Sequence, residues 1–152
     1  MTAKKRRPFT LVVNAKKDQG MYKGGCLCGG IRYEITGEIT DIVYCHCSEC
    51  RKAQGSAFAT NGVVDTASFH ILSGEDLLTS FEPSPGYAKL FCSKCGSPII
   101  SKSNKKPGVV RVRLGTIESD ILERPQAHIF VVSKANWEEI CGELPRFDEF
   151  PE

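Results

Sequence analysis

The sequence has no long hydrophobic run, because its longest apolar stretches fall far short of the roughly 18 residues that a membrane-spanning helix needs. Residues 1–23 are basic and polar, so they do not resemble a secretory leader. We therefore expect a cytoplasmic, reducing environment, in which structural disulfides rarely persist. These absences argue against a membrane protein and against a disulfide-stapled secreted one.

A large excess of charge of one sign is also absent, since 20 Lys and Arg face 18 Asp and Glu. Residues 1–23 hold seven basic residues and one acidic residue, which leaves thirteen basic and seventeen acidic residues, a net charge of −4, for the rest. The body of the chain is thus not typical of a nucleic-acid-binding protein. Residues 4–7, Lys-Lys-Arg-Arg, fit either a polyanion-binding or nuclear-import signal or a solvated tail, and we predict a flexible basic tail over residues 1–20.

Helical periodicity is scarce, and short β-branched runs bounded by turn residues are common. We predict strands over residues 31–35, 109–114 and 128–132, and a pair of strands over residues 58–64 and 69–72 joined near Asp65. Short helical turns are expected over residues 48–54 and 135–140. The length and the ordinary 41% hydrophobic content suit one domain, so residues 21–152 are predicted to form a single, mostly β domain.

Seven of the eight cysteines form three tight clusters: Cys26-Leu-Cys28, Cys45-His-Cys47-Ser-Glu-Cys50 and Cys92-Ser-Lys-Cys95. Such spacing lets neighbouring thiolates converge on one soft cation, as at zinc sites. The natural division is four plus three, with the two pairs closing one tetrahedron and the trio holding a second ion with an open position. Cys141 stands alone and is expected to be a small core residue.

Other arrangements of the sulfurs remain open at this point. Cys47, Cys50, Cys92 and Cys95 have the spacing of an ordinary zinc ribbon, and His46 is a possible fourth ligand of the trio. Seven cysteine thiolates divided into a pair, a trio and a pair suit zinc ions better than an iron–sulfur cluster. The glycines at 24, 25, 29, 30 and 96 flank the two pairs, and each allows a positive φ that turns backbone N–H groups toward thiolate sulfur.

These motifs together resemble the glutathione-dependent formaldehyde-activating enzyme family, which also includes centromere protein V. The resemblance covers about residues 21–146. It is carried by the runs Gly25-Cys26-Leu27-Cys28-Gly29-Gly30-Ile31-Arg32-Tyr33, Cys45-His46-Cys47-Ser48-Glu49-Cys50-Arg51-Lys52, Gly55-Ser56-Ala57-Phe58, Phe91-Cys92-Ser93-Lys94-Cys95-Gly96-Ser97-Pro98, Gly115-Thr116-Ile117 and Pro125-Gln126-Ala127-His128-Ile129-Phe130-Val131, with Trp137. The family often has Arg where this chain has Lys89.

The resemblance implies a zinc-containing fold of coiled antiparallel sheets, similar to methionine-R-sulfoxide reductases and to a small exchange-factor chaperone of Rab GTPases. It also implies two zinc ions. One is structural and bound by both cysteine pairs, Cys26, Cys28, Cys92 and Cys95; the other is catalytic, exchangeable and bound by Cys45, Cys47 and Cys50.

The implied activity is that of a carbon–sulfur lyase that joins glutathione to formaldehyde to give S-(hydroxymethyl)glutathione. This addition needs a thiolate nucleophile and develops negative charge on the carbonyl oxygen, so a Lewis acid can assist either partner. We expect Arg51 and Lys52 to bind a glutathione carboxylate, Ser56 to contact the substrate, and His128 either to transfer protons or to be structural. The alternatives are a zinc-stabilised binding module like centromere protein V and a thiol chaperone that takes up zinc transiently.

Overall fold

The computed structural model describes residues 21–151, so the predicted basic tail over residues 1–20 lies outside the described residues. Ten strands form two sheets, and one short α-helix lies between β3 and β4 in the chain. The elements are β1 (Tyr22–Gly25), β2 (Arg32–Ile35), β3 (Thr40–Cys45), α1 (Ser48–Gln54), β4 (Ala59–Asp65), β5 (Phe69–Ser73), β6 (Leu78–Ser84), β7 (Tyr87–Cys92), β8 (Pro98–Ser103), β9 (Val109–Arg113) and β10 (Ala127–Ile129). Four 3₁₀ turns cover Thr66–Ser68, Glu75–Leu77, Leu114–Thr116 and Val131–Ser133.

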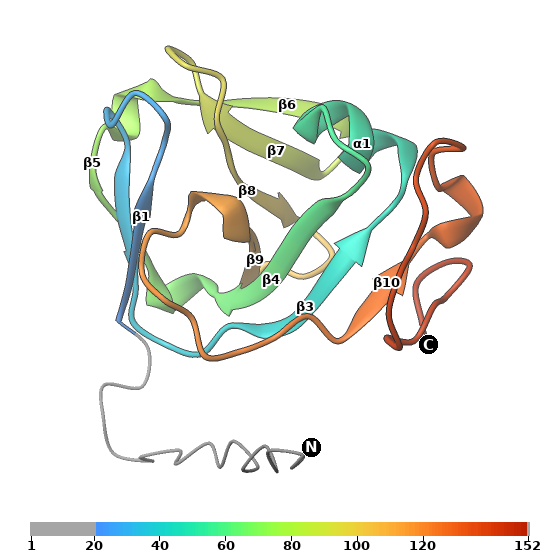
Figure 1. Ribbon diagram of the computed structural model, residues 1–152. Coiled ribbons are helices and arrows are strands. Elements are labelled where there is room, and N and C mark those ends of the chain that lie inside the picture. Colours follow the sequence, from blue (N-terminus) through green and yellow to red (C-terminus); the bar gives the residue numbers. More distant parts are fainter. Residues whose placement is uncertain (1–20, 152) are drawn as a thin grey trace, which may run out of the picture.

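The small sheet has the order β1-β2-β5, and the large sheet has the order β10-β3-β4-β9-β8-β7-β6 (Figure 1). All the pairings are antiparallel except that of β10 with β3, which is parallel. The predicted mostly β fold of antiparallel sheets is therefore confirmed. Within the described residues, no helix is both long and apolar enough to cross a membrane.

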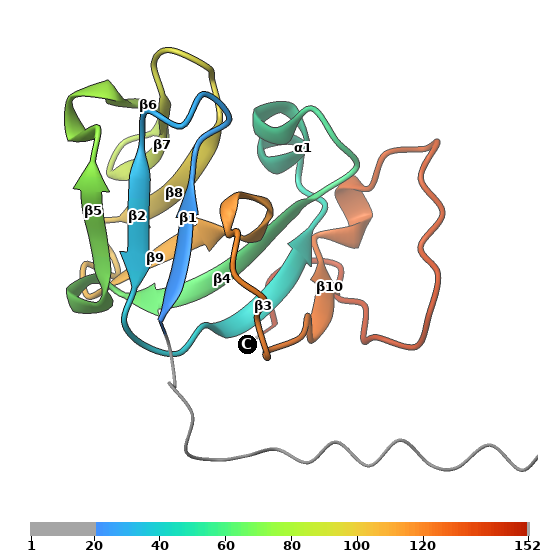
Figure 2. The ribbon, with the colours of Figure 1, turned by 60° about the vertical axis from the view of Figure 1, so that its left-hand side comes forward.

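The main core lies between the two sheets, as the turned view indicates (Figure 2). In β2 the alternation of residue types gives a buried side chain at every second position, so Tyr33 and Ile35 are fully buried. They pack with side chains of the large sheet such as Ile42, Val64 and Val112. Burial of this apolar surface is the main force that holds the small sheet on the large one.

Three details of the predicted elements are wrong. The strands β4 and β5 do not pair, because β4 lies between β3 and β9 whereas β5 joins β2 in the other sheet. The strand predicted for residues 128–132 ends at Ile129, since Phe130 has a left-handed backbone with φ of 55° and a 3₁₀ turn follows. Residues 135–140 form only a hydrogen-bonded turn, in which the Glu138 N–H donates to the Ala135 carbonyl.

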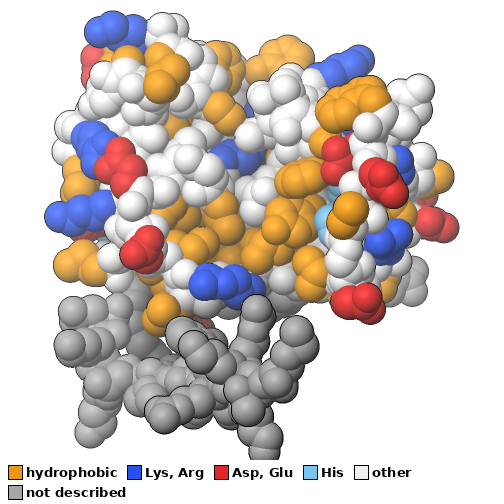
Figure 3. Space-filling view, viewed as in Figure 1, with side chains coloured by type: hydrophobic (Ala, Val, Ile, Leu, Met, Phe, Trp, Pro, Cys, Tyr) orange, Lys and Arg blue, Asp and Glu red, His pale blue; other side chains and the backbone are white. Residues whose placement is uncertain are grey.

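The helix predicted over residues 48–54 is confirmed as α1. Its first turn is capped by Cys47, whose sulfur accepts a hydrogen bond from the Cys50 N–H at 3.3 Å. It ends at Gly55, which adopts a left-handed conformation with φ of 62°. On the face drawn in Figure 3, hydrophobic side chains gather near the centre, and basic and acidic side chains are scattered around them.

Candidate metal centre and the adjoining cavity

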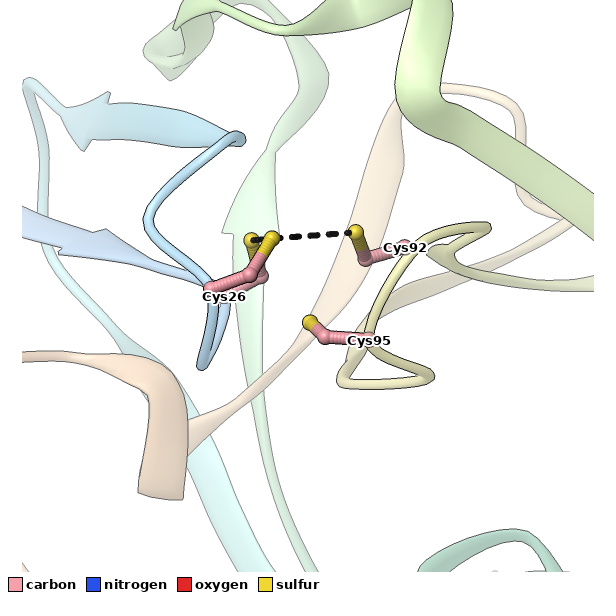
Figure 4. A group of neighbouring side chains, drawn as sticks. Cys26, Cys92 and Cys95 are labelled. Atoms are coloured by element: carbon pink, nitrogen blue, oxygen red, sulfur yellow. Dashed lines mark hydrogen bonds between the residues drawn. The ribbon is translucent and has the colours of Figure 1, made fainter.

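Both cysteine pairs meet at one point between the sheets. The sulfurs of Cys26, Cys28, Cys92 and Cys95 all lie within 4.8 Å of one another. Cys26 and Cys28 follow β1, whereas Cys92 ends β7 and Cys95 lies in the turn before β8, so the four sulfurs bring the small and the large sheet together (Figure 4). The predicted grouping of the two pairs is what the structure has, and the zinc-ribbon grouping of Cys47 and Cys50 with the last pair is wrong.

Backbone N–H groups and one hydroxyl surround these sulfurs. The Ile31 N–H donates to the Cys26 sulfur at 3.2 Å, and the Ser97 hydroxyl lies 3.3 Å from the Cys95 sulfur. The Ser97 hydroxyl and the surrounding N–H groups lower the pKa of Cys95 to about 5. Ser97 also accepts a hydrogen bond from the Leu27 N–H at 2.8 Å, which ties the two cysteine turns to each other.

The flanking glycines serve two different purposes. Gly29 and Gly96 have positive φ, 78° and 79°, as expected for turns that fold back toward a metal ligand. Gly24, Gly25 and Gly30 do not, and the expectation of a positive φ there is wrong. Gly24 and Gly25 lie in β1, where space is the constraint: a Cβ on Gly24 would lie 2.4 Å from the Thr116 carbonyl oxygen, and one on Gly25 would lie 2.5 Å from the Ile31 carbonyl oxygen.

The four sulfurs fit a tetrahedral metal ion. Zinc–sulfur bonds of about 2.3 Å imply sulfur–sulfur separations of roughly 3.8 Å in a tetrahedron. The Cys26 and Cys28 sulfurs are 3.5 Å apart, and the Cys28 and Cys92 sulfurs are 3.9 Å apart. A set of four thiolates that is closed by its own ligands is typical of a structural zinc site.

The cysteine trio forms a second group where β3 ends and α1 begins. Cys45 ends β3, Cys47 caps α1, and Cys50 lies in the first turn of that helix. Their sulfurs also lie within 4.8 Å of one another. Hydrogen bonding with Cys45 and Cys50 holds the pKa of Cys47 far below its usual range, and the positive charge of Lys89 acts in the same direction. Three cysteine sulfurs this close together suit a soft cation such as zinc.

His46 does not join this group. Its ring is fully buried, and its Nε2 lies 2.9 Å from Nδ1 of His128, so one ring donates to the other. Burial lowers the pKa of His46 to about 4 and also lowers the pKa of His128, so both rings are neutral at pH 7. The contact between the two rings joins the end of β3 to β10. Neither ring lines the cavity that lies beside the cysteine trio.

A cavity of about 820 Å³ opens beside the trio. All three cysteines line it, together with the side chains of Val43 and Ile129 and the C-terminal residues Phe147 and Phe150. Its basic and neutral polar lining comes from β4, β7, β9, the turn before β9 and the residue before β10: Asn61, Tyr87, Lys89, Lys106, Arg111 and Gln126. Because the cysteine trio lines a cavity of this size, a small molecule can reach it.

The residues expected to bind glutathione lie elsewhere. Arg51, Lys52 and Ser56 are on or just after α1, and none of them lines the cavity. Lys52 and Ser56 are exposed, and Arg51 is partly buried. The cavity residues Asn61 and Arg111 went unnoticed in the sequence because neither belongs to a recognisable motif, and only the pairing of β4 with β9 brings them to one wall. Cys141 is exposed, so its predicted place in the core is wrong.

Comparisons with known proteins agree with the motifs. Residues 21–133 match the family model described as glutathione-dependent formaldehyde-activating enzyme. A curated protein of Halomonas elongata named for that same family is 33% identical over 132 residues, which are 79% of this chain and 81% of that protein. A crystal structure of a Rhodobacter sphaeroides protein is similar in fold, with a TM-score of 0.57 and 21% identity, over 82% of this chain and 98% of that one.

Proposed function

Because the chain belongs to the glutathione-dependent formaldehyde-activating enzyme family, we propose that it adds glutathione, or a similar thiol, to formaldehyde or another small aldehyde. The products are S-(hydroxymethyl)glutathione-type adducts, and the reverse reaction is that of a carbon–sulfur lyase. The family's name describes an enzyme that acts on formaldehyde with glutathione. The chemistry of the cysteine trio and its cavity supports the finer assignment.

The observation that carries the proposal is that three sulfurs converge within 4.8 Å on the wall of the cavity. Cys45, Cys47 and Cys50 are the residues that would hold a zinc ion there, and three protein ligands leave room for one exchangeable ligand. A zinc ion in such a site supplies Lewis acidity, which favours the thiolate form of a bound thiol or polarises a carbonyl oxygen. The four-cysteine group would hold a second, structural zinc.

The residues around the trio have separate tasks in this proposal. Cys47 precedes α1, and hydrogen bonds with Cys45 and Cys50, together with the charge of Lys89, favour its thiolate. His46 and His128 hold β3 and β10 in place behind the trio. The apolar side chains of Val43, Ile129 and Phe147 keep part of the cavity dry, which strengthens electrostatic interactions inside it.

The test is adduct formation. Zinc-loaded protein is mixed with glutathione and ¹³C-formaldehyde, and the growth of the S-hydroxymethyl signal is followed by NMR exchange spectroscopy. We expect the native protein to accelerate the reaction over the uncatalysed rate. In Cys47→Ser we expect this acceleration to fall at least about a hundredfold, because a site with one sulfur ligand fewer binds the metal ion less tightly and no longer positions it. Cys141→Ser, at an exposed cysteine outside both groups, is the matched control. If native protein does not accelerate the reaction with any of several aldehydes and thiols, the proposal is wrong.

A further inference from the structure

A row of polar side chains crosses three neighbouring strands, and the basic residues at its two ends line the cavity. Lys89 on β7 pairs with Ser101 on β8, and Ser101 pairs with Arg111 on β9. Residues paired in this way project from the same face of a sheet, so Lys89 and Arg111 face the cavity from strands on either side of β8. At the usual strand spacing their backbones are about 10 Å apart. The Tyr87 hydroxyl donates to Ser101 Oγ at 3.2 Å and holds the middle of the row.

Two polar atoms in the cavity wall are buried without a hydrogen-bond partner. The Lys89 Nζ is shielded from solvent and makes no hydrogen bond, although it lies over the Tyr87 ring at 5.2 Å. The Asn61 side chain is only 6% exposed, and its Oδ1 accepts no hydrogen bond. A buried amide or ammonium group without a hydrogen-bond partner destabilises the unliganded protein, and a ligand that supplies the missing partner removes that cost. Both residues line the cavity, so a ligand entering it meets one unpaired donor and one unpaired acceptor.

The row is also positively charged. In the part of the chain that the structure describes, the one ion pair is Arg32 with Glu118, so no carboxylate neutralises Lys89 or Arg111. The exposed Lys106 adds a third cation to the lining, and both it and Arg111 lie over the Phe150 ring, at 5.9 and 5.8 Å. Two acidic residues, Asp41 and Glu49, line the cavity as well, but both are exposed, so water screens their charge.

We propose that this row, Lys89 and Arg111 with Asn61 beside them, is a carboxylate-binding subsite that restricts the substrates of the cavity to anionic thiols. The proposal rests on the proposed function, in which the thiol end of the same molecule reaches the cysteine trio. Lys89 and Arg111 donate to the carboxylate, the amide oxygen of Asn61 accepts an N–H of the ligand, and exposed Asp41 and Glu49 are left for an ammonium group. Glutathione carries all of these groups, and so do shorter carboxylate-bearing thiols in part.

Binding is measured first, with a ligand that cannot react. S-methylglutathione has no free thiol, so its affinity, measured by isothermal titration calorimetry, depends on neither turnover nor sulfur coordination. We expect Lys89→Met and Arg111→Gln each to weaken binding about tenfold or more, since each removes a charge-assisted hydrogen bond. Lys94→Met, at an exposed lysine that does not line the cavity, is the matched control and should bind as the native protein does.

The ester of the ligand provides a test that needs no variant. The dimethyl ester of S-methylglutathione keeps the shape and loses both negative charges, so we expect it to bind the native protein at least about tenfold more weakly. Equal binding of acid and ester would overturn the proposal, and so would unchanged affinity in both Lys89→Met and Arg111→Gln. Absence of binding at millimolar S-methylglutathione would overturn it as well.

Rates with small thiols separate this inference from the proposed function. 3-Mercaptopropionate, 2-mercaptoethanol and cysteamine are similar in size and carry a negative, a neutral and a positive group. For each thiol, the rate with protein is divided by the uncatalysed rate. A larger acceleration for 3-mercaptopropionate than for the other two thiols supports the subsite. Equal acceleration of all three refutes the subsite and leaves the proposed function standing. Charge-dependent binding without acceleration of any thiol leaves the subsite standing and refutes the proposed function.

Discussion

At the scale of single residues, Gly24 in β1 has no room for a side chain. A Cβ there would lie 2.4 Å from the Thr116 carbonyl oxygen and 2.5 Å from the Tyr33 ring, whose hydroxyl is 2.7 Å from Thr116 Oγ1. Tyr33 is fully buried in the core, so it has no room to move aside. The small residue therefore allows β1 to approach the 3₁₀ turn Leu114–Thr116 closely, as the bridge between Gly24 and Ile117 shows.

We expect Gly24→Ala to lower the free energy of unfolding by about 1–3 kcal/mol, because a new methyl group overpacks this contact. Gly108→Ala is the control, since a Cβ added there would meet no atom within 4 Å and the φ of Gly108 is not positive. It should change stability by less than about 0.5 kcal/mol. Urea unfolding of both metal-loaded variants measures the difference, and equal stability of the two would contradict the steric argument.

A second prediction at this scale compares one cysteine from each group. Cys95→Ser opens the four-sulfur site that joins the sheets, so we expect loss of the folded state at 25 °C, because structural zinc contributes about 10 kcal/mol or more to folding in small zinc domains. Cys47→Ser alters a site within the large sheet, so we expect a folded protein that binds about one metal ion fewer. Circular dichroism and metal analysis by mass spectrometry report both results; equal unfolding of the two variants would contradict the division.

At the scale of elements, β1 is fastened to the segment before β10. The Tyr22 hydroxyl donates to Glu123 at 2.6 Å, and the other carboxylate oxygen accepts from the Ile39 N–H at 3.1 Å. Burial, together with the hydrogen bond and negative charge of Glu123, raises the pKa of Tyr22 to about 12. A Tyr in the unfolded chain titrates near 10. The protonated hydroxyl thus stabilises the folded state below pH 10, and this contribution is lost as the pH rises toward 12.

We therefore expect the native protein to lose about 1 kcal/mol more stability than Tyr22→Phe between pH 10 and pH 11. Tyr33, whose pKa burial also raises to about 12, contributes equally to both proteins, so the difference isolates Tyr22. Urea unfolding at pH 9, 10 and 11 measures the two slopes. Parallel slopes would show that the Tyr22–Glu123 contact does not couple to folding.

At the scale of the whole molecule, the two sulfur groups differ in what they connect. The four-cysteine group joins the small sheet to the large one, and the trio lies within the large sheet and α1. Four thiolates hold a metal ion more firmly than three, and the trio also opens on the cavity. A chelator such as EDTA should therefore remove the trio's metal first.

In a chelator titration of metal-loaded protein we expect two steps. The first releases about one ion with little change in far-ultraviolet circular dichroism, and the second releases another together with cooperative unfolding, because only the second ion bridges the sheets. Metal release is followed with a colorimetric zinc indicator. A single step in which release and unfolding coincide would show that the two groups are not independent.

Much of the site could be read from spacing alone, because ligands two or three residues apart converge within one turn of backbone. The cysteine trio is such a case, and so are the turns at Gly29 and Gly96. The helix α1 was also predictable, since its boundaries are set by local residues. The partner of each strand was not: β4 and β5 are neighbours in the chain but belong to different sheets, and their alternation of residue types is equally compatible with either pairing.

The mostly β class and the cysteine groups follow from the order of the residues, because strand periodicity and close ligand spacing are local properties. That Lys89, Asn61 and Arg111 line the same cavity as the trio depends on the three-dimensional fold, since they come from three strands whose adjacency depends on long-range pairing. The same holds for His46, whose ring turns to His128 across the parallel pairing of β3 with β10 rather than toward the neighbouring sulfurs. Contacts between residues far apart in the chain are selected by packing of the whole core, which no short stretch of sequence encodes.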